Sequence, residues 1–333
     1  MPILIQYKMK NGTFTISLDF ELHWGVFDKI DIKNKTTYFD NTIIIIPKIL
    51  ELFSKHNIEA TWATVGLLFN SNIDNLKSNK PINIPLYDNS KLSAYNYINK
   101  NFQQKFSKYL FAPNLIDFIK KTKGQEIATH TYSHYYCLEK GQNINNFNED
   151  LQKCNELAKQ KGITFKSIVL PRNQYNVKYN KICYKNGIRI LRSNPNIWFW
   201  NTMTPETLQK KIFRTLDCYI PLFKSYYSFN KIVIKKNQPI LLPASRFFRP
   251  VSKYHFLNKI RIKRIKKEMT NAAKKNMFYH LWWHPHNYGN KPQNALLELE
   301  EILLHFKKLK EKYNMNSMNM DNIYETYFGN SQK

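Results

Sequence analysis

Residues 13–20 read TFTISLDF, an alternating, β-branched stretch that predicts a strand with an acidic residue near its end. Outward from this stretch, further apolar runs alternate with segments of helical periodicity. Strands are expected at 13–20, 60–65, 125–131, 167–170, 188–191, 239–244 and 277–283. Helices are expected at 43–56, 113–122, 147–161, 178–186, 205–214, about 259–267 and 292–311. This order predicts a parallel α/β sheet or barrel.

The expected barrel is a single domain, because no linker divides the chain. It should span residues 13–315, with a polar, irregular insertion at 70–105. Residues 1–12 are expected to form an N-terminal extension, and residues 316–333 a C-terminal segment.

The 333 residues carry a formal net charge of +27, although their hydrophobic fraction of 43% is ordinary for a globular protein. A nucleic acid, an anionic glycan or a membrane surface would each account for such an excess of Lys and Arg. The excess is dispersed and no nucleic-acid module is recognisable, so we expect no nucleic-acid partner. The stretch 259–267, KIRIKRIKK, is either the solvated face of a helix or a peripheral membrane contact.

The four cysteines are widely spaced, which predicts reduced, mostly buried thiols: Cys137, Cys154, Cys183 and Cys218. The first residues lack the sustained apolar segment of a signal peptide, and no stretch is long and apolar enough to span a membrane. We therefore expect a cytoplasmic protein, with the inner membrane face as the alternative location.

Residues with reactive side chains follow the expected strands, where the carboxyl ends of barrel strands place them together. Asp19 and Glu21 end the first strand in SLDFELHWG, and their spacing of two puts both on one side. His130 and His134 follow the third strand in ATHTYSH, a spacing at which two imidazoles can bind one ion. Structural histidines, and a Glu21–Lys salt bridge, are the plainer alternatives.

A cation between these groups would offset the cost of placing two acids in one pocket. Two histidines and one carboxylate leave an open position on a metal ion, as in catalytic zinc sites, and the other carboxylate remains free as a base. Asp19, His284 and Arg172 can then supply a base, an acid and a group that holds the base.

Together these motifs resemble the polysaccharide deacetylase family, the NodB-type carbohydrate esterases, over about residues 13–287. SLDFELHWG is similar to the first family motif, HTYSH to its metal-binding motif, LPRNQYN to its arginine motif, and WWHPHN to the late histidine motif. Phe20 separates the two acids, which the common form of the first motif places side by side. Asn173 and Gln174 replace both prolines of the arginine motif, and Asn176 replaces its glycine.

The resemblance implies a distorted (β/α)7-type barrel that binds a divalent ion, most simply Zn²⁺, through Glu21, His130 and His134. It implies hydrolysis of an N-acetyl group on a sugar of a surface polysaccharide, or on its nucleotide- or lipid-linked precursor. Asp19 would act as the base, Arg172 would orient it and His284 would be the acid. Which acid binds the metal, and which of His280, His284 and His286 is the acid, are left open.

Further residues near these motifs are candidates for binding the sugar. Aromatic side chains stack on sugar rings, and an arginine can bind an acidic sugar or a phosphate, although core packing and a salt bridge are the plain alternatives. The candidates are Trp24, Tyr175, Trp283, His286 and Arg246.

Two rival functions are compatible with the same residues. A glycoside hydrolase would use Asp19 and Glu21 as its carboxylate pair, but it leaves HTYSH without a role. A non-catalytic glycan-binding protein on the same barrel would need neither a metal ion nor the base.

Overall fold

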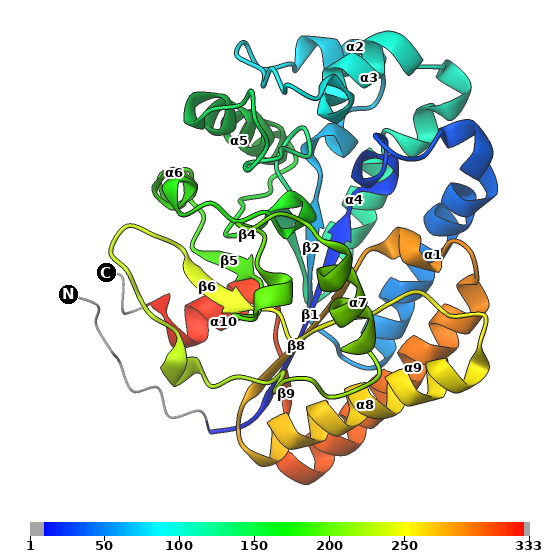
Figure 1. Cartoon of the computed structure of the whole chain (residues 1–333), viewed down its shortest axis with the longest axis vertical. Coiled ribbons are helices and arrows are strands. Elements are labelled where there is room, and N and C mark those ends of the chain that lie inside the picture. Colours follow the sequence, from blue (N-terminus) through cyan, green and yellow to red (C-terminus); the bar gives the residue numbers. More distant parts are fainter. Residues whose placement is uncertain (1–9, 330–333) are drawn as a thin grey trace.

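The computed structural model describes residues 10–329, and it confirms the parallel α/β barrel (Figure 1). Its strands pair in the order β6-β5-β4-β3-β2-β1-β8-β7, every pair parallel, and β9 adds to β1. The strands are β1 (Thr13–Phe20), β2 (Ala60–Thr64), β3 (Gln125–Thr129), β4 (Ser167–Val169), β5 (Ile190–Ser193), β6 (Ile240–Pro243), β7 (Arg246–Phe247), β8 (Phe278–Trp283) and β9 (Asn316–Ser317). The first nine residues of the expected N-terminal extension lie outside the described residues.

One stretch of chain, residues 240–247, closes the barrel. Its first part, β6, pairs with β5, and its second part, β7, pairs with β8. Between them, Ala244 N donates to Ser193 O and Ser245 N donates to His280 O, each at 2.8 Å. Counted as one strand, β6 and β7 complete a barrel with β1–β5 and β8, as expected for the (β/α)7 type.

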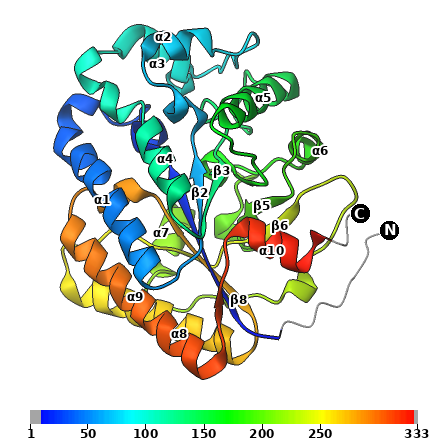
Figure 2. The same ribbon diagram turned by 180° about the vertical axis from the view of Figure 1, so that it is seen from behind.

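Helices surround the strands, and the pairs α1–α9 and α8–α9 pack side by side on one flank (Figures 1 and 2). The helices are α1 (Thr36–Lys55), α2 (Ile73–Ser78), α3 (Ala94–Asn101), α4 (Pro113–Lys121), α5 (Ile144–Gln160), α6 (Asn180–Lys185), α7 (Leu208–Leu216), α8 (His255–Lys274), α9 (Pro292–Tyr313) and α10 (Met320–Tyr327). The expected insertion, residues 70–105, holds α2, α3 and short 3-10 turns. Helix α1 starts seven residues before the expected Ile43 and continues through Pro47.

The alternation of β1 sorts its side chains into two environments. Phe14, Ile16, Leu18 and Phe20 belong to the main apolar core beneath the helices. The intervening polar residues take the opposite face, toward the barrel interior, where Ser17 Oγ lies 2.8 Å from His280 Nε2 of β8. Asp19 is the last residue on this inner face, so the strand delivers its carboxylate to the carboxyl end of the barrel.

The end of the described chain covers the opposite mouth of the barrel. Strand β9 pairs with β1, and α10 contributes Met320, Ile323 and Phe328 to a second apolar cluster with Ile190 and Phe278. Residues 316 to 329 of the expected C-terminal segment therefore pack against the base of the barrel. All four cysteines are free and buried, as expected. Among the described residues, no helix is long and apolar enough to cross a membrane.

Candidate active site

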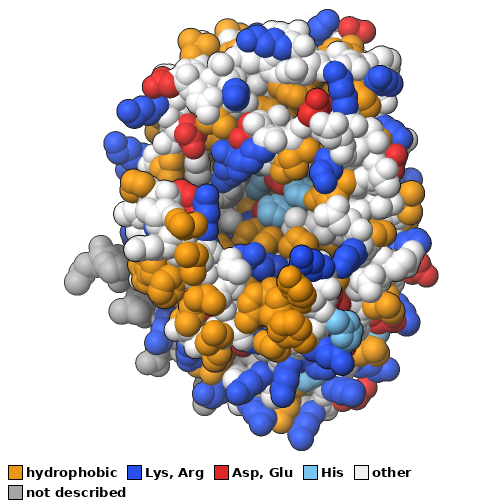
Figure 3. Space-filling view, turned by 45° about the vertical axis from the view of Figure 1, so that its right-hand side comes forward, with side chains coloured by type: hydrophobic (Ala, Val, Ile, Leu, Met, Phe, Trp, Pro, Cys, Tyr) orange, Lys and Arg blue, Asp and Glu red, His pale blue; other side chains and the backbone are white. Residues whose placement is uncertain are grey.

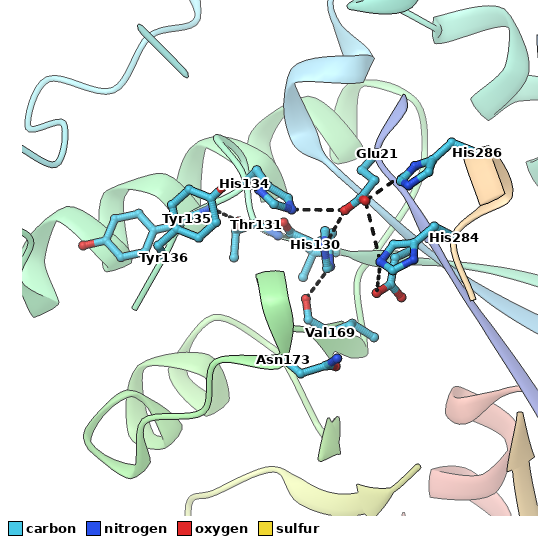
Figure 4. A network of polar contacts seen from close by, with 12 residues as sticks. Glu21, His130, Thr131, His134, Tyr135, Tyr136, Val169, Asn173, His284 and His286 are labelled. Atoms are coloured by element: carbon cyan, nitrogen blue, oxygen red, sulfur yellow. Dashed lines mark hydrogen bonds and ion pairs between the residues drawn. The ribbon is translucent and has the colours of Figure 1, made fainter. Parts of the chain in front are cut away.

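The centre of the site is the carboxylate of Glu21, which is buried just beyond the end of β1 (Figure 4). The chain turns sharply after it into the 3-10 turn Leu22–Gly25, and Leu22 adopts a positive φ of 45°. A Cβ atom on Gly25 would lie 1.8 Å from Glu21 Oε1. Gly25 is thus required for the position of this carboxylate, although sequence reasoning did not single it out.

His130 and His134 approach one oxygen of Glu21 from the loop after β3. Their Nε2 atoms lie 3.4 Å and 3.1 Å from Glu21 Oε2. His130 Nδ1 lies 2.8 Å from the carbonyl oxygen of Val169 and can only donate to it, which leaves Nε2 with a lone pair. His134 Nδ1 lies 2.9 Å from the hydroxyl of Tyr136. Such second contacts fix the orientation of an imidazole that binds a metal ion.

The loop that carries these two histidines is held by Asp150 of α5. The Asp150 carboxylate accepts hydrogen bonds from Tyr132 N at 2.7 Å and from Ser133 N at 3.0 Å. The loop needs this support because Thr131 and His134 both have positive φ values, which are unfavourable for residues other than glycine. Sequence reasoning did not identify Asp150, which lies 16 residues beyond His134.

His284 and His286 approach Glu21 from the turn after β8. His284 Nε2 lies 3.7 Å and His286 Nδ1 3.6 Å from Glu21 Oε1. His284 Nε2 also lies 3.6 Å from Asp19 Oδ2, and its Nδ1 is 3.2 Å from Asn287 Oδ1. His280 lies deeper, fully buried, with Nε2 on Ser17 Oγ rather than on either acid. Of the three histidines of this motif, His284 alone contacts both acids.

Arg192 of β5 holds the carboxylate of Asp19. Its two terminal nitrogens lie 2.6 Å and 2.8 Å from the two Asp19 oxygens, a bidentate pair in the barrel interior. The same guanidinium donates to Asn173 Oδ1 at 2.8 Å and lies 4.3 Å from the ring centre of Trp282. Arg192 was not among the expected site residues.

The expectation that Arg172 orients Asp19 is wrong. Arg172 has a positive φ of 54° and points away, with its guanidinium 2.5 Å from Asp28 Oδ2 and 4.4 Å from the ring centre of Tyr136. The replacement of the expected prolines by Asn173 and Gln174 accompanies this geometry, and Asn173 contacts Arg192 instead. Arg172 therefore contacts Tyr136, whose hydroxyl contacts His134, whereas Asp19 is held by Arg192.

The surroundings favour ionised acids and a neutral imidazole at His134. Burial alone would raise the pKa of Asp19, but Arg192, His130 and His284 outweigh it and the pKa is lowered. Burial likewise opposes ionisation of Glu21, yet the adjacent histidines hold its pKa well below the usual range. Burial lowers the pKa of His134 to about 4 against the attraction of Glu21. The imidazole of His134 is thus neutral at pH 7, the form that binds a metal ion.

Three of the expected sugar-binding residues are buried in other roles. Trp24 is fully buried, and its Nε1 donates to Leu110 O. Trp283 is also fully buried; it points outward from β8 into the apolar core, because the residues that face the barrel interior are His280 and Trp282. Arg246 is 4% exposed and is paired with Asp217 and Glu268. None of the three is accessible to a sugar.

Of the expected sugar-binding residues, Tyr175 is partly exposed, whereas His286 is 5% exposed and faces Glu21. Trp282 lies 5.6 Å from His284, ring centre to ring centre, and 6.3 Å from Trp200. Trp200 and Tyr175 line a groove of about 820 Å³ that runs beside β5 and β6. Figure 3 shows histidine side chains inside a surface hollow with Lys and Arg side chains around it.

The donor atoms around Glu21 fit a divalent cation. Glu21, His130 and His134 offer one carboxylate oxygen and two imidazole nitrogens within 4.8 Å of one another, all from buried residues. His130 Nε2 has no hydrogen-bond partner although it is buried, which is costly unless an ion binds there. One carboxylate and two imidazoles are a ligand set of catalytic zinc sites.

The sequence profile of the polysaccharide deacetylase family matches residues 33–191, and this range includes the HTYSH motif and Arg172. Over this range, just under half of the chain, the sequence is similar to the polysaccharide deacetylase family. The profile does not reach Asp19, Glu21, His284 or His286, so the structure alone joins these residues to the site. A search among curated proteins gave no match.

Solved structures share this fold at low identity. A Mycobacterium smegmatis protein assigned as a polysaccharide deacetylase is 12% identical, with a TM-score of 0.62 over 99% of this chain and 94% of that one. The Puue allantoinase is 9% identical, with a TM-score of 0.55 over 98% and 94%. A 4-alpha-glucanotransferase from Thermococcus litoralis is 11% identical, with a TM-score of 0.52 over 96% of this chain but 41% of its own. At these identities the likeness shows the fold alone.

Proposed function

We propose that this chain is a metal-dependent deacetylase that hydrolyses an N-acetyl group on a sugar. The observation that supports this most is the convergence of Glu21, His130 and His134 beside Asp19, an acid that is not part of this group of ligands. A free carboxylate next to a metal site is what hydrolysis of an amide requires of a base.

Glu21, His130 and His134 would hold the ion, which we take to be Zn²⁺ because two of the three donors are imidazoles. When bound, a divalent ion would polarise the acetyl carbonyl and acidify water in the site. The chain's own residues supply the remaining steps, beginning with Asp19, which Arg192 holds in a fixed orientation in its ionised form.

Asp19 accepts a proton from the attacking water, whose oxygen forms the new bond to the acetyl carbon. The C–N bond then breaks, and His284 Nε2 delivers a proton to the departing nitrogen of the sugar. His284 suits this task because its Nε2 faces the acids while its Nδ1 faces Asn287. The products are acetate and the free amine.

The groove beside β5 and β6 supports a sugar substrate longer than one residue. It is large enough for several sugar rings, and Trp198, Trp200 and Tyr175 offer aromatic faces among asparagine side chains. We propose that the substrate is a surface polysaccharide or its nucleotide- or lipid-linked precursor, and that the enzyme acts on it in the cytoplasm.

A basic and apolar surface beside this groove favours the lipid-linked precursor and a contact with the inner membrane face. Leu208 of α7 is 72% exposed and Phe256 of α8 is 60% exposed. The two helices adjoin, because Arg264 of α8 pairs with Asp217 just after α7. Exposed apolar side chains surrounded by lysines are typical of proteins that lie on anionic membranes. The exposed lysines in or next to these two helices include Lys211, Lys253, Lys259 and Lys263.

The deacetylase proposal is tested by acetate release from N-acetylated oligosaccharides, using the metal-loaded and the chelated protein. We expect chelation to abolish acetate release and Asp19→Asn to lower kcat by about 10²–10⁴-fold. New reducing ends without acetate would contradict the proposal and indicate a glycoside hydrolase. Full activity of the Asp19→Asn variant would show that the base lies elsewhere.

The membrane contact is tested by sedimentation with vesicles that contain phosphatidylglycerol. Leu208→Ser and Phe256→Ser should each weaken binding, and salt should weaken it further. Ile82→Ser is the matched control, because Ile82 is 93% exposed and belongs to the insertion rather than to α7 or α8. If the protein bound neutral vesicles at high salt as strongly as it binds anionic vesicles, the basic charge of this surface would play no part in binding, and the proposed contact would be wrong.

A further inference from the structure

The late motif brings two histidines to the oxygen of Glu21 that His130 and His134 do not use. His284 Nε2 and His286 Nδ1 lie 3.7 Å and 3.6 Å from Oε1, whereas the other pair contacts Oε2 (Figure 4). The two rings of the late motif are stacked, with their centres 5.0 Å apart. The carboxylate therefore presents one oxygen to each pair of imidazoles, in the manner of a bridging ligand.

The spacing within this second group suits a cation. Ligand atoms at about 2.0–2.1 Å from a tetrahedral metal ion lie about 3.4 Å from one another. The donor atoms of Glu21, His284 and His286 all lie within 4.8 Å of one another. These separations exceed the length of a hydrogen bond but are close to those of ligands around one ion.

His286 provides an independent sign of a ligand. It is 5% exposed, and its Nδ1 atom, which faces Glu21, is buried without a hydrogen-bond partner among the described residues. Burial of a polar atom without a hydrogen-bond partner costs free energy, so this atom is expected to bind a group such as an ion. His284 directs its other nitrogen at Asn287, which leaves Nε2 facing the same space.

We propose that Glu21, His284 and His286 form a second divalent-cation site, which shares the Glu21 carboxylate with the site of His130 and His134. Paired metal sites in hydrolases place their ions about 3.5–4 Å apart, a separation that a shared carboxylate provides. The second site is more open than the first, because His284 is partly exposed while His130 and His134 are fully enclosed. It should bind its ion more weakly.

Occupation of the second site has a consequence for activity that rests on the proposed function. His284 Nε2 is the atom that protonates the leaving nitrogen, and an ion on that atom removes the acid. Activity should therefore rise with the first equivalent of metal and fall when the second binds. The number of bound ions, by contrast, does not depend on the reaction.

The test is a calorimetric titration of the chelator-treated full-length protein with Zn²⁺, with elemental analysis of the loaded protein. We expect two ions per chain in the wild type and one in His286→Asn. The ion that remains in the variant shows that the site of His130 and His134, and hence the fold, is intact. His23→Phe is the control. His23 is buried, follows Glu21 by two residues and packs on Phe39, but it belongs to neither group of metal ligands, so this variant should bind two ions.

A second readout uses Mn²⁺, whose electron paramagnetic resonance spectrum should show coupled ions in the wild type and an isolated ion in His286→Asn. The ratio of the rates at one and ten equivalents of metal, measured within each protein, should exceed about fivefold for the wild type and approach one for the variant. One ion in the wild type, or two in His286→Asn, would overturn the second site. Two ions without any deacetylase activity would overturn the proposed function and leave the cation site standing.

Discussion

In the proposed mechanism, Arg192 determines which carboxylate acts as the base. It is buried with Asp19, and each of its terminal nitrogens contacts one carboxylate oxygen, so Asp19 is oriented and kept ionised. Glu21, two residues further on, has histidines as its neighbours in place of an arginine. The two carboxylates thus serve different purposes. Arg192 compensates the negative charge of Asp19, and a metal ion would compensate that of Glu21.

Replacement of Arg192 by Met would leave Asp19 buried without its counter-charge. We expect the free energy of unfolding to fall by about 3–5 kcal/mol, as for other broken buried ion pairs. Activity should fall by at least about 100-fold, because the base loses its orientation. Urea unfolding and acetate release measure the two effects.

The double variant Asp19→Asn/Arg192→Met separates them, since it should recover much of the stability and none of the activity. Arg172→Met is a further comparison: its guanidinium pairs with Asp28, so kcat should fall less than in Arg192→Met. An equal loss in the two arginine variants would contradict the assignment of Arg192 to Asp19.

Gly25 is the second residue on which the position of a carboxylate depends. Gly25→Ala would place a Cβ atom on Glu21 Oε1 and displace the shared ligand. We expect metal affinity to fall about 10–100-fold, the range found when the support of a metal ligand is lost. Competition with a chelator measures the affinity. Gly329→Ala is the control, because its nearest neighbour would be a flexible carboxylate oxygen at 3.2 Å, and unchanged affinity in Gly25→Ala would contradict the argument.

At the scale of elements, the order of strands, helices and motifs could be predicted, because each strand is apolar and each reactive group follows a strand end. Glu21, His130, His134 and His284 were predicted in this way, from spacing and from family likeness, and the structure brings their side chains together. Arg192 was missed because the expected strand ended at Leu191. The signal was present in ILRS, since Ile190 and Arg192 share a face of β5 and an arginine on an inward face needs a buried acid.

The errors at Trp24, Trp283 and Arg246 have one physical origin. Sequence position places a residue near a strand end but does not give the direction of its side chain. In WW, one ring must point into the barrel and the other into the core; the structure assigns the inward direction to Trp282. Short elements, such as β7 and β9, were also missed because two residues show no periodicity.

The loop from His130 to His134 depends on a helix that carries no ligand. Asp150→Asn would replace a carboxylate that accepts two backbone hydrogen bonds by an amide that can accept only at its oxygen. We expect Zn²⁺ affinity to fall about 10–100-fold, since the strained loop would relax and move both histidines. Asp117→Asn, an Asp to Asn change at the surface of α4, should leave affinity unchanged. Loss of stability with unchanged affinity would limit Asp150 to a structural role.

At the scale of the molecule, the two ends of the barrel differ in how the charge of an enclosed carboxylate is compensated. The reactive mouth stabilises ionised acids with Arg192 and histidines, whereas at the base of the barrel the carboxylate of Glu126 is enclosed without a cation beside it among residues 10–329. Glu126 accepts hydrogen bonds from Thr61 Oγ1 at 2.6 Å and from Asp321 N at 3.1 Å, at the start of α10. Burial, together with the charge of Asp321, raises the pKa of Glu126 to about 7.

This raised pKa makes stability depend on pH in a defined direction. Below about pH 4.5 the acid is protonated in both the folded and the unfolded chain, and the stability is complete. As the pH rises toward 7, the unfolded chain loses its proton first, and the folded state is progressively destabilised. Glu126→Gln keeps an acceptor oxygen for Thr61 and Asp321 but carries no charge, so it should stabilise the protein by on the order of 2 kcal/mol at pH 8 and have little effect at pH 4.5.

Urea unfolding of both proteins at the two pH values measures this difference. Glu311→Gln, which removes an exposed carboxylate at the end of α9, is the control and should change stability little at either pH. A variant that is less stable at pH 8 would mean that the Glu126 charge is compensated in the folded state. Glu126 lies beside α10, at the mouth of the barrel opposite the proposed active site. Glu126→Gln should therefore raise the free energy of unfolding at pH 8 while the rate of acetate release at that pH stays the same, because the variant changes no residue near Asp19 or Glu21.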